Sequence, residues 1–115
     1  MTENYITINL EEGMPYVDQA IKKLTYHIKT NKKSGVKAIK IIHGFGSSGT
    51  GGRIRVESRA YLARLKGRRE ITDFIPGEQL SIFDQATRKA LDLCPEMRQD
   101  RDLDRHNNGV TVIIL

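Results

Sequence analysis

The pattern of apolar and polar residues in the first half of the chain predicts a strand, a helix and a second strand. Residues 5–10 alternate with period two, which predicts a half-buried strand. Apolar side chains then recur at helical spacing over residues 15–30, and Pro15 suits the first position of a helix. The run 38–42 is too apolar for a strand with an exposed face, so we place it centrally in a sheet. This order predicts two parallel strands joined by a right-handed crossover.

The second half of the chain continues with a helix, a strand and a further helical segment. Helical spacing returns over residues 53–66, and residues 71–75 form a third strand. Asp84 can cap another helix, which ends before the next proline. Residues 96–108 are almost wholly polar, which predicts a mobile, solvated loop.

The closing strand, residues 110–115, raises the question of what covers the second face of the sheet. Two right-handed crossovers place both main helices on one face, yet this strand is apolar everywhere except at Thr111. We therefore predict that residues 84–94 pack on the other face, within the chain or against a second copy in a homodimer. The alternative is that the third strand curls over that face. The inserted helix and its mobile polar loop, residues 84–106, belong to a single domain that spans residues 1–115.

Charge and cysteine content narrow the range of partners. The 115 residues include 19 Lys and Arg against 14 Asp and Glu, a formal net charge of +5 that favours polyanionic partners. The positive residues cluster in the first third of the chain and again after the glycine-rich segment that follows residue 43. The single cysteine, Cys94, excludes an internal disulfide and a cysteine-based zinc site. No segment resembles a signal peptide or a membrane span, so we expect a cytoplasmic protein with no membrane partner.

Five glycines lie between the second strand and the second helix, and residues 44–49 match the Gly-x-Gly-x-x-Gly string of dinucleotide-binding folds. That motif requires glycines that open the helix directly and an acidic residue at the end of the next strand. Here residues 49–52 lengthen the turn, and Asp73 lies farther along than the motif expects. A Walker loop is excluded because no Gly-Lys-Ser or Gly-Lys-Thr occurs. We therefore expect no nucleotide cofactor.

The same loop is suited to a phosphodiester backbone. Successive glycines let backbone N–H groups converge on an anion, and the following helix presents its positive end to the same place. Hydroxyl and cationic side chains add further phosphate contacts. The predicted RNA- or DNA-binding residues are His43, Gly44, Gly46, Ser47, Ser48, Gly49, Thr50, Arg53, Arg55, Arg59 and Lys66. The alternative is a flexible surface loop beside an ordinary solvated helix face.

Two segments resemble the Smr (small MutS-related) domain family. The run His43-Gly44-Phe45-Gly46, followed by a basic helix, is similar to that family's His-Gly-x-Gly segment, and the terminal run NGVTVIIL is similar to its closing strand. The resemblance covers about the whole chain except residues 84–106, which look like an insertion. It implies an α/β fold of the two-layer α+β sandwich type, with a mixed four-stranded sheet in the order β-α-β-α-β-β. The C-terminal domain of translation initiation factor 3 shares that order.

The family resemblance also implies nucleic-acid binding and, in several members, a nicking or RNA-cutting endonuclease activity. Smr nucleases carry a Leu-Asp-x-His-Gly signature after the first strand, where this chain has Asn9 at the aspartate position and Glu11 at the histidine position. An endonuclease here would use His43 with Glu11 or Glu12, as acid and base or with a shared Mg²⁺ or Mn²⁺. The simpler interpretation is that the glutamates favour the positive end of a helix and that His43 holds the loop by a backbone hydrogen bond. A third hypothesis is a protein-interaction module that binds no nucleic acid.

Overall fold

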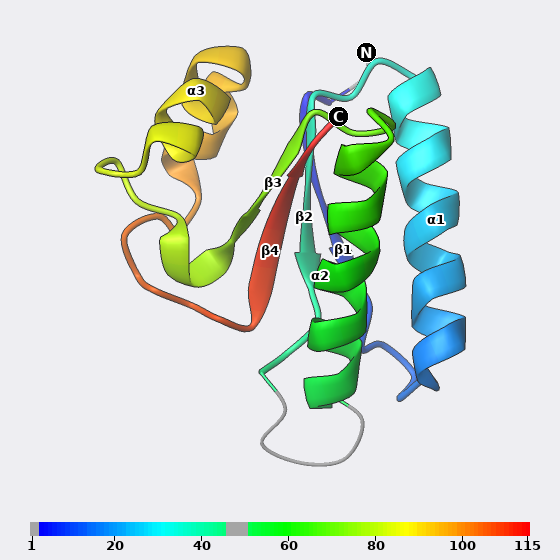
Figure 1. The fold of residues 1–115 in the computed structure, drawn as a ribbon. Coiled ribbons are helices and arrows are strands. Elements are labelled where there is room, and N and C mark those ends of the chain that lie inside the picture. Colours follow the sequence, from blue (N-terminus) through cyan, green and yellow to red (C-terminus); the bar gives the residue numbers. More distant parts are fainter. Residues whose placement is uncertain (1–2, 46–50) are drawn as a thin grey trace.

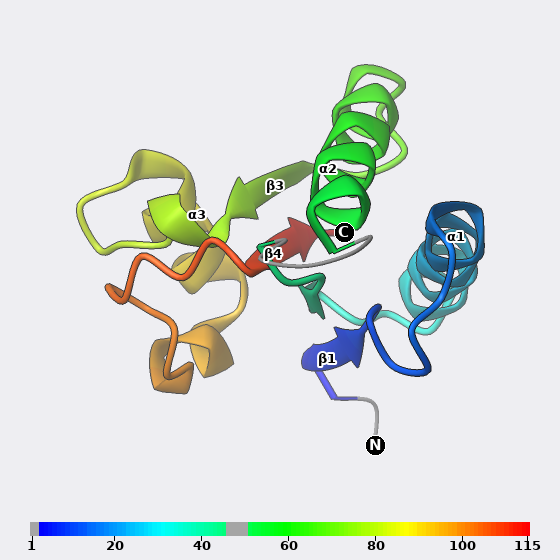
Figure 2. The same ribbon diagram turned by 90° about the horizontal axis from the view of Figure 1, so that it is seen from below.

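The computed structural model describes residues 3–45 and 51–115 and contains one four-stranded sheet between two unequal helical layers (Figures 1 and 2). The strands are β1 (Tyr5–Asn9), β2 (Ala38–Ile42), β3 (Asp73–Pro76) and β4 (Val110–Ile114), and their order in the sheet is β1-β2-β4-β3. β1 and β2 are parallel, whereas β4 is antiparallel to both of its neighbours. The mixed sheet and the order of elements confirm the predicted fold class.

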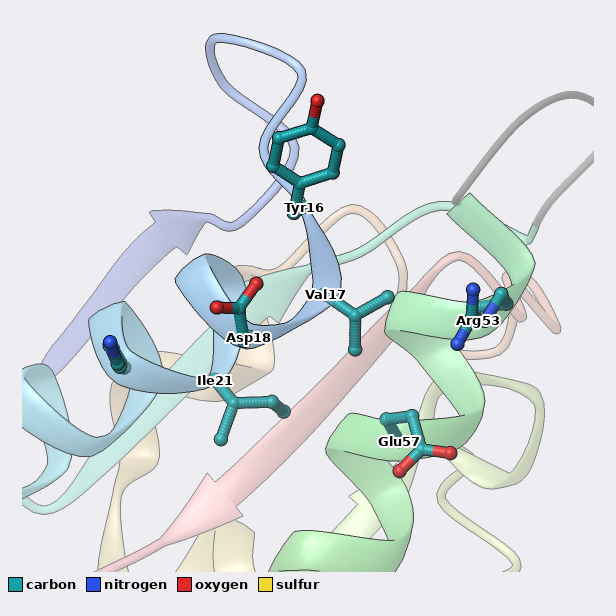
Figure 3. Close-up of a pocket in the computed structure, with 7 residues that line it drawn as sticks. Tyr16, Val17, Asp18, Ile21, Arg53 and Glu57 are labelled. Carbon is teal, nitrogen blue, oxygen red and sulfur yellow. The ribbon is translucent and has the colours of Figure 1, made fainter.

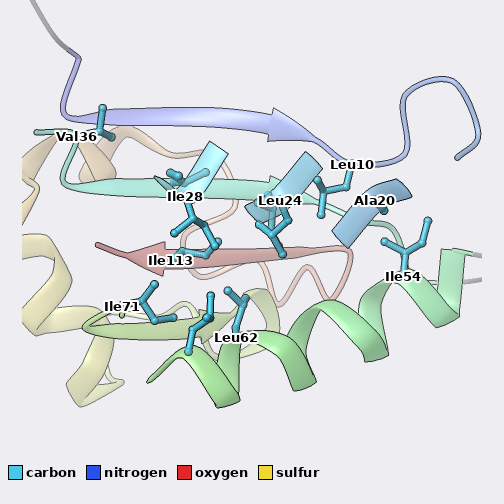
Figure 4. Packing of buried hydrophobic residues seen from close by; sticks show 12 residues of the cluster. Leu10, Ala20, Leu24, Ile28, Val36, Ile54, Leu62, Ile71 and Ile113 are labelled. Carbon is cyan, nitrogen blue, oxygen red and sulfur yellow. The ribbon is translucent and has the colours of Figure 1, made fainter. Parts of the chain in front are cut away.

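The larger helical layer consists of α1 (Val17–Lys33) and α2 (Gly51–Gly67), which lie side by side on one face of the sheet (Figure 1). Side chains from both helices pack there on alternate residues of the central strands, including Ile39 and Ile41 of β2. Figure 4 shows part of this cluster, with Ile113 of β4 among the labelled residues. β2 and β4 occupy the two central positions, and nearly all of their residues are buried. The central place of β2 is the one that the hydrophobic pattern predicted. Burying these aliphatic side chains is the main contribution to the stability of the domain.

The second face of the sheet is covered by α3 (Gln85–Leu93) and the short 3₁₀ helix η2 (Pro95–Gln99) (Figure 2). Asp84 caps α3, since its Oδ2 accepts a hydrogen bond of 2.9 Å from the backbone N–H of Thr87. Apolar side chains of this segment, including Leu91 and Met97, pack on Val112. The prediction that residues 84–94 cover this face is confirmed, and the cover comes from the same chain. A second copy is not needed there, and β3 stays within the sheet.

The segment after α3 is largely exposed, as its polar sequence predicted, but it also contributes buried residues. Met97 and Asp102 are buried, and residues 95–99 form a 3₁₀ helix. The Nζ atom of Lys40, on β2, donates a 2.8 Å hydrogen bond to Asp100 Oδ1 and forms an ion pair with Asp102. The prediction of solvation does not hold for Asp100 and Asp102, because these two carboxylates neutralise a lysine that the central strand buries.

The helix boundaries also differ from the sequence expectation. α1 begins at Val17 rather than at Pro15, because the Gln19 side chain accepts a 2.9 Å hydrogen bond from the N–H of Tyr16 and so caps the helix there. Gly35 follows the end of α1 with a φ of +86°, the left-handed conformation expected of a helix stop. Within the described residues, no helix is both long and apolar enough to cross a bilayer.

Candidate nucleic-acid interface

Three connections meet at one edge of the sheet, where β1 and β2 end and β4 begins (Figure 1). The backbone N–H groups of His43 and Gly44 both donate 3.0 Å hydrogen bonds to the carbonyl of Gly109, just before β4. The first turn of α2 lies at the same edge. Five of the predicted phosphate-binding residues fall outside the described part of the chain: Gly46, Ser47, Ser48, Gly49 and Thr50.

Gly44 and Glu11 lie against each other at this edge. Gly44 has a φ of +71°, and any side chain there would overlap the carboxylate of Glu11. Glu11 therefore lies beside the backbone that follows His43, while the His43 ring itself has other partners. Glu12 instead points to solvent, with its carboxylate 3.9 Å from Lys23 Nζ. No group of three or more His, Cys, Asp or Glu side chains within residues 3–45 and 51–115 could hold a metal ion.

His43 is the buried centre of a hydrogen-bond chain. Its Nδ1 lies 2.7 Å from the Gly44 carbonyl oxygen and its Nε2 lies 2.8 Å from Thr111 Oγ1. A carbonyl can only accept, so Nδ1 carries the proton and Nε2 accepts from the Thr111 hydroxyl. Arg59 Nε in turn donates to the same hydroxyl oxygen at 3.0 Å. Both ring nitrogens are thus occupied by protein groups, and the ring is fully buried.

The environment of His43 keeps the ring neutral. Burial lowers its pKa to about 4, and the positive charges of Arg59 and Arg55 act in the same direction against the opposing effect of the Gly44 hydrogen bond. A ring that is buried, neutral and doubly hydrogen-bonded holds the loop in place. The geometry therefore favours the simpler interpretation of His43 over a role as acid or base.

Arg59 is held inside the protein rather than presented to solvent. Its two terminal nitrogens donate to the Glu78 carboxylate at 2.9 and 2.8 Å, a bidentate pair. One of them also donates to the Val110 carbonyl at 3.2 Å. The sequence grouped Arg59 with the phosphate-binding residues because helical spacing alone cannot show that a partner from another element neutralises it. Glu78 and Thr111 were missed for the same reason, although Thr111 is the one polar residue in an otherwise apolar strand.

Replacing Arg59 with alanine should lower the free energy of unfolding by about 2 kcal/mol, since it removes charged hydrogen bonds and leaves Thr111 and the Val110 carbonyl short of a donor. Chemical denaturation monitored by circular dichroism measures this loss. Arg53→Ala is the matched control, because Arg53 is exposed, and it should stay within about 0.5 kcal/mol of the unmodified protein. Equal effects of the two substitutions would contradict the structural role of Arg59.

The remaining predicted cations lie at opposite ends of α2. Arg53 and Arg55 are in its first two turns, with Arg53 exposed and Arg55 partly buried. Lys66 is in the last turn, about 20 Å away along the helix axis, and its Nζ lies 2.9 Å from Asp73 Oδ1. A single phosphate-binding loop therefore cannot include Lys66.

A groove of about 770 Å³ runs between the first turns of α1 and α2 (Figure 3). Its apolar floor includes Val17 and Ile21, and its walls carry both signs of charge. The full lining is Tyr16, Val17, Asp18, Ile21, Lys22, Arg53 and Glu57. Because the two carboxylates offset the two cations, the groove itself is not a strong anion site.

Comparison with known proteins agrees with the architecture. No protein-family model and no curated protein matches the chain. Among solved structures, the crystal structure of the Smr domain of Thermus thermophilus MutS2 matches with a TM-score of 0.56 and 17% sequence identity, over 97% of this chain and 96% of that chain. The chain has the fold of an Smr domain. In this Smr-like domain the His-Gly-x-Gly segment begins at the end of β2, and its histidine is bonded to the closing strand β4.

Proposed function

We propose that this Smr-like domain binds the phosphate backbone of RNA or DNA through residues 45–53 and the start of α2. His43 and Gly44, which the sequence grouped with the phosphate contacts, shape this connection from behind, since the ring of His43 is buried and Gly44 lies against Glu11. The observation that carries the proposal is the composition of the first turn of α2. That turn has no acidic residue, and Arg53 and Arg55 follow its two glycines. The positive end of a 17-residue helix and two guanidinium groups therefore act at one place.

The net charge of the whole chain and the aromatic residues at this sheet edge support the same partner. The formal net charge of +5 favours a polyanion. Tyr16 and Phe45, at the same sheet edge, expose 72% and 56% of their surface, and exposed aromatic rings are stacking partners for unpaired bases. The resemblance of the sequence to the Smr family implies nucleic-acid binding as well.

We do not propose that His43 is catalytic. Its ring nitrogens are both hydrogen-bonded within the protein, and a substrate phosphate placed near Gly44 would meet the carboxylate of Glu11. Endonuclease activity and a pure protein-interaction role are the two alternative functions. A cleavage assay on plasmid DNA and RNA with Mg²⁺ or Mn²⁺ tests the first, and absence of any nucleic-acid affinity would favour the second.

Replacing Arg53 and Arg55 together with glutamine should weaken binding of fluorescently labelled RNA or DNA by about tenfold near 0.1 M salt. Binding releases about one counterion for each phosphate contact. The loss of two contacts should therefore reduce the magnitude of the slope of log affinity against log salt by about 2. Fluorescence anisotropy over a salt titration measures both quantities.

The matched control removes two exposed cations from the other face of the sheet, Lys89→Gln with Arg98→Gln. It loses the same net charge and should change the affinity by no more than about twofold. Two results would contradict the proposal: equal losses in the two variants, or an affinity of the unmodified protein that is independent of salt.

A further inference from the structure

A concentration of exposed positive charge lies at the end of the helical layer opposite the glycine-rich segment. α1 and α2 run in the same direction, so their carboxyl-terminal ends lie side by side (Figure 1). Lys32 Nζ links them by donating a 2.7 Å hydrogen bond to the Glu70 carbonyl. Eight exposed cations belong to this end, which we call the basic end: Lys29, Lys32, Lys33, Lys37, Arg64, Lys66, Arg68 and Arg69.

Few carboxylates balance the basic end. Among the described residues, Asp73 lies 2.9 Å from Lys66 and Glu70 lies 3.8 Å from Arg68, and these are the carboxylates within 4 Å of the eight cations. Eight positive and two negative side chains leave six positive charges, whereas the whole chain carries +5. The rest of the molecule is therefore close to neutral. The positive charge of this protein is concentrated at one end.

Helix stabilisation does not account for this set of cations. A cation in the last turn of a helix stabilises it by about 0.3–1 kcal/mol, which covers Lys32 and Lys33 in α1 and Arg64 and Lys66 in α2. The other four lie before or beyond those turns. Arg69 even occupies a left-handed conformation, with a φ of +62°, at a position after a helix where glycine is usual. An arginine there costs backbone energy and adds an exposed charge.

A track of side chains on α1 connects the basic end to the glycine-rich end. Lys22, Tyr26, Lys29 and Lys33 are spaced by three or four residues and are all exposed, so they lie along one face of the helix. Lys22 lines the groove beside Arg53, and Lys33 belongs to the basic end. Each main helix has 17 residues and is about 25 Å long. That length corresponds to about seven base pairs of a duplex at 3.4 Å per step.

We propose that the basic end is a second phosphate-contacting surface, so that a nucleic-acid strand extends along the α1–α2 layer instead of stopping at the glycine-rich segment. This inference rests on the proposed function and adds to it the path of the bound strand. Contacts of this kind are with the backbone, so they increase affinity and salt dependence equally for all sequences.

The test replaces three cations of the basic end that have no hydrogen-bonded or ion-paired partner among the described residues: Lys29→Gln, Lys33→Gln and Arg69→Gly. Binding of 16-nucleotide single strands and 16-base-pair duplexes, each as RNA and as DNA, is measured by anisotropy over a salt titration. We expect a loss of at least about tenfold in affinity near 0.1 M salt and a decrease of about 2 to 3 in the salt slope.

The control again removes equal charge from the other sheet face, with Lys89→Gln, Arg98→Gln and Arg105→Gln, and should change affinity by no more than about twofold. A basic-end variant that binds like this control overturns the inference and leaves the proposed function standing. An unmodified protein that binds none of the four probes overturns both. Thermal unfolding checks that the variants are folded, and the single substitution Arg69→Gly, which relieves a strained backbone, should weaken binding without lowering stability.

Discussion

Replacing Lys40 with methionine should lower the free energy of unfolding by about 3–5 kcal/mol, the largest effect we expect of any single substitution discussed above. The Lys40 side chain is 8% exposed and is the only cation within 4 Å of the buried carboxylates of Asp100 and Asp102 in the described residues. Burial alone would lower the pKa of Lys40, but the hydrogen bonds and charges of the two aspartates outweigh it and raise the pKa. Methionine fills a similar volume, so the loss of stability comes from the two carboxylates, which are left buried without a positive charge beside them. Chemical denaturation at pH 7 measures it.

The control for Lys40→Met removes the whole charge cluster. The triple variant Lys40→Met, Asp100→Asn, Asp102→Asn buries no net charge, and an asparagine carbonyl at position 100 can still accept the hydrogen bond of 2.6 Å that the Tyr5 hydroxyl gives to Asp100. It should recover most of the stability, because a buried ion pair replaced as a unit costs far less than a broken one. A single variant as stable as the unmodified protein would show that water reaches the cluster.

Part of the arrangement of the sheet could be predicted from the sequence because it depends on hydrophobic pattern. A run too apolar for a strand with an exposed face is expected at a central position, which placed β2 correctly. The same reasoning required a cover for the second face, and the apolar residues of 84–94 were the available candidates. Burial of apolar surface is non-directional, so a pattern of residue types is enough to indicate it.

The polar interactions could not be predicted in this way, because each depends on one partner at a specific distance. Composition alone could not show that Lys40 is buried, and the sequence placed Asp100 and Asp102 in a solvated loop. In the structure these three side chains form one buried cluster. Arg59 shared helical spacing with Arg55, but Glu78 neutralises it from another element. A lysine inside an apolar strand is the signal that could have indicated the first of these pairs.

The distribution of charge over the surface was also hidden in the sequence. Two runs of basic residues, one in the first third and one after the glycines, belong to neighbouring parallel helices. Their later members therefore meet at the basic end, far from the glycine-rich segment. Lys66 is the one of them that the sequence had grouped with that segment. Charged residues that are clustered in the sequence can be assigned to one surface only when the direction of each helix is known.

Acidification from pH 7.5 to 4.5 should lower the free energy of unfolding by about 2.5 kcal/mol through His43 alone. The pKa of this ring is about 4 in the folded protein against an ordinary value of 6.5, so below pH 6.5 the unfolded chain binds a proton that the folded chain excludes. The exclusion of this proton contributes about 3 kcal/mol of stability in total. That contribution is fully present above pH 6.5 and is lost as the pH falls toward 4. Denaturation curves at half-unit pH intervals measure the slope, which should approach about 1.4 kcal/mol per pH unit.

The substitution His43→Gln isolates this contribution, because a glutamine amide does not titrate in this range. The variant should be less stable at pH 7.5, but its stability should change less with pH between about 6.5 and 4.5. Burial alone would raise the pKa values of Glu78 and Asp102, but their pairs with Arg59 and Lys40 hold both below the ordinary range. Acid therefore also weakens these pairs, and the contribution of His43 is the difference in pH dependence between the unmodified protein and His43→Gln. His27 is a partly buried ring whose pKa is lowered by burial and by the charge of Lys23, so His27→Gln is the matched control. An unchanged pH slope in His43→Gln would mean that solvent reaches the ring, and it would reopen an acid–base role for His43 at this edge of the sheet.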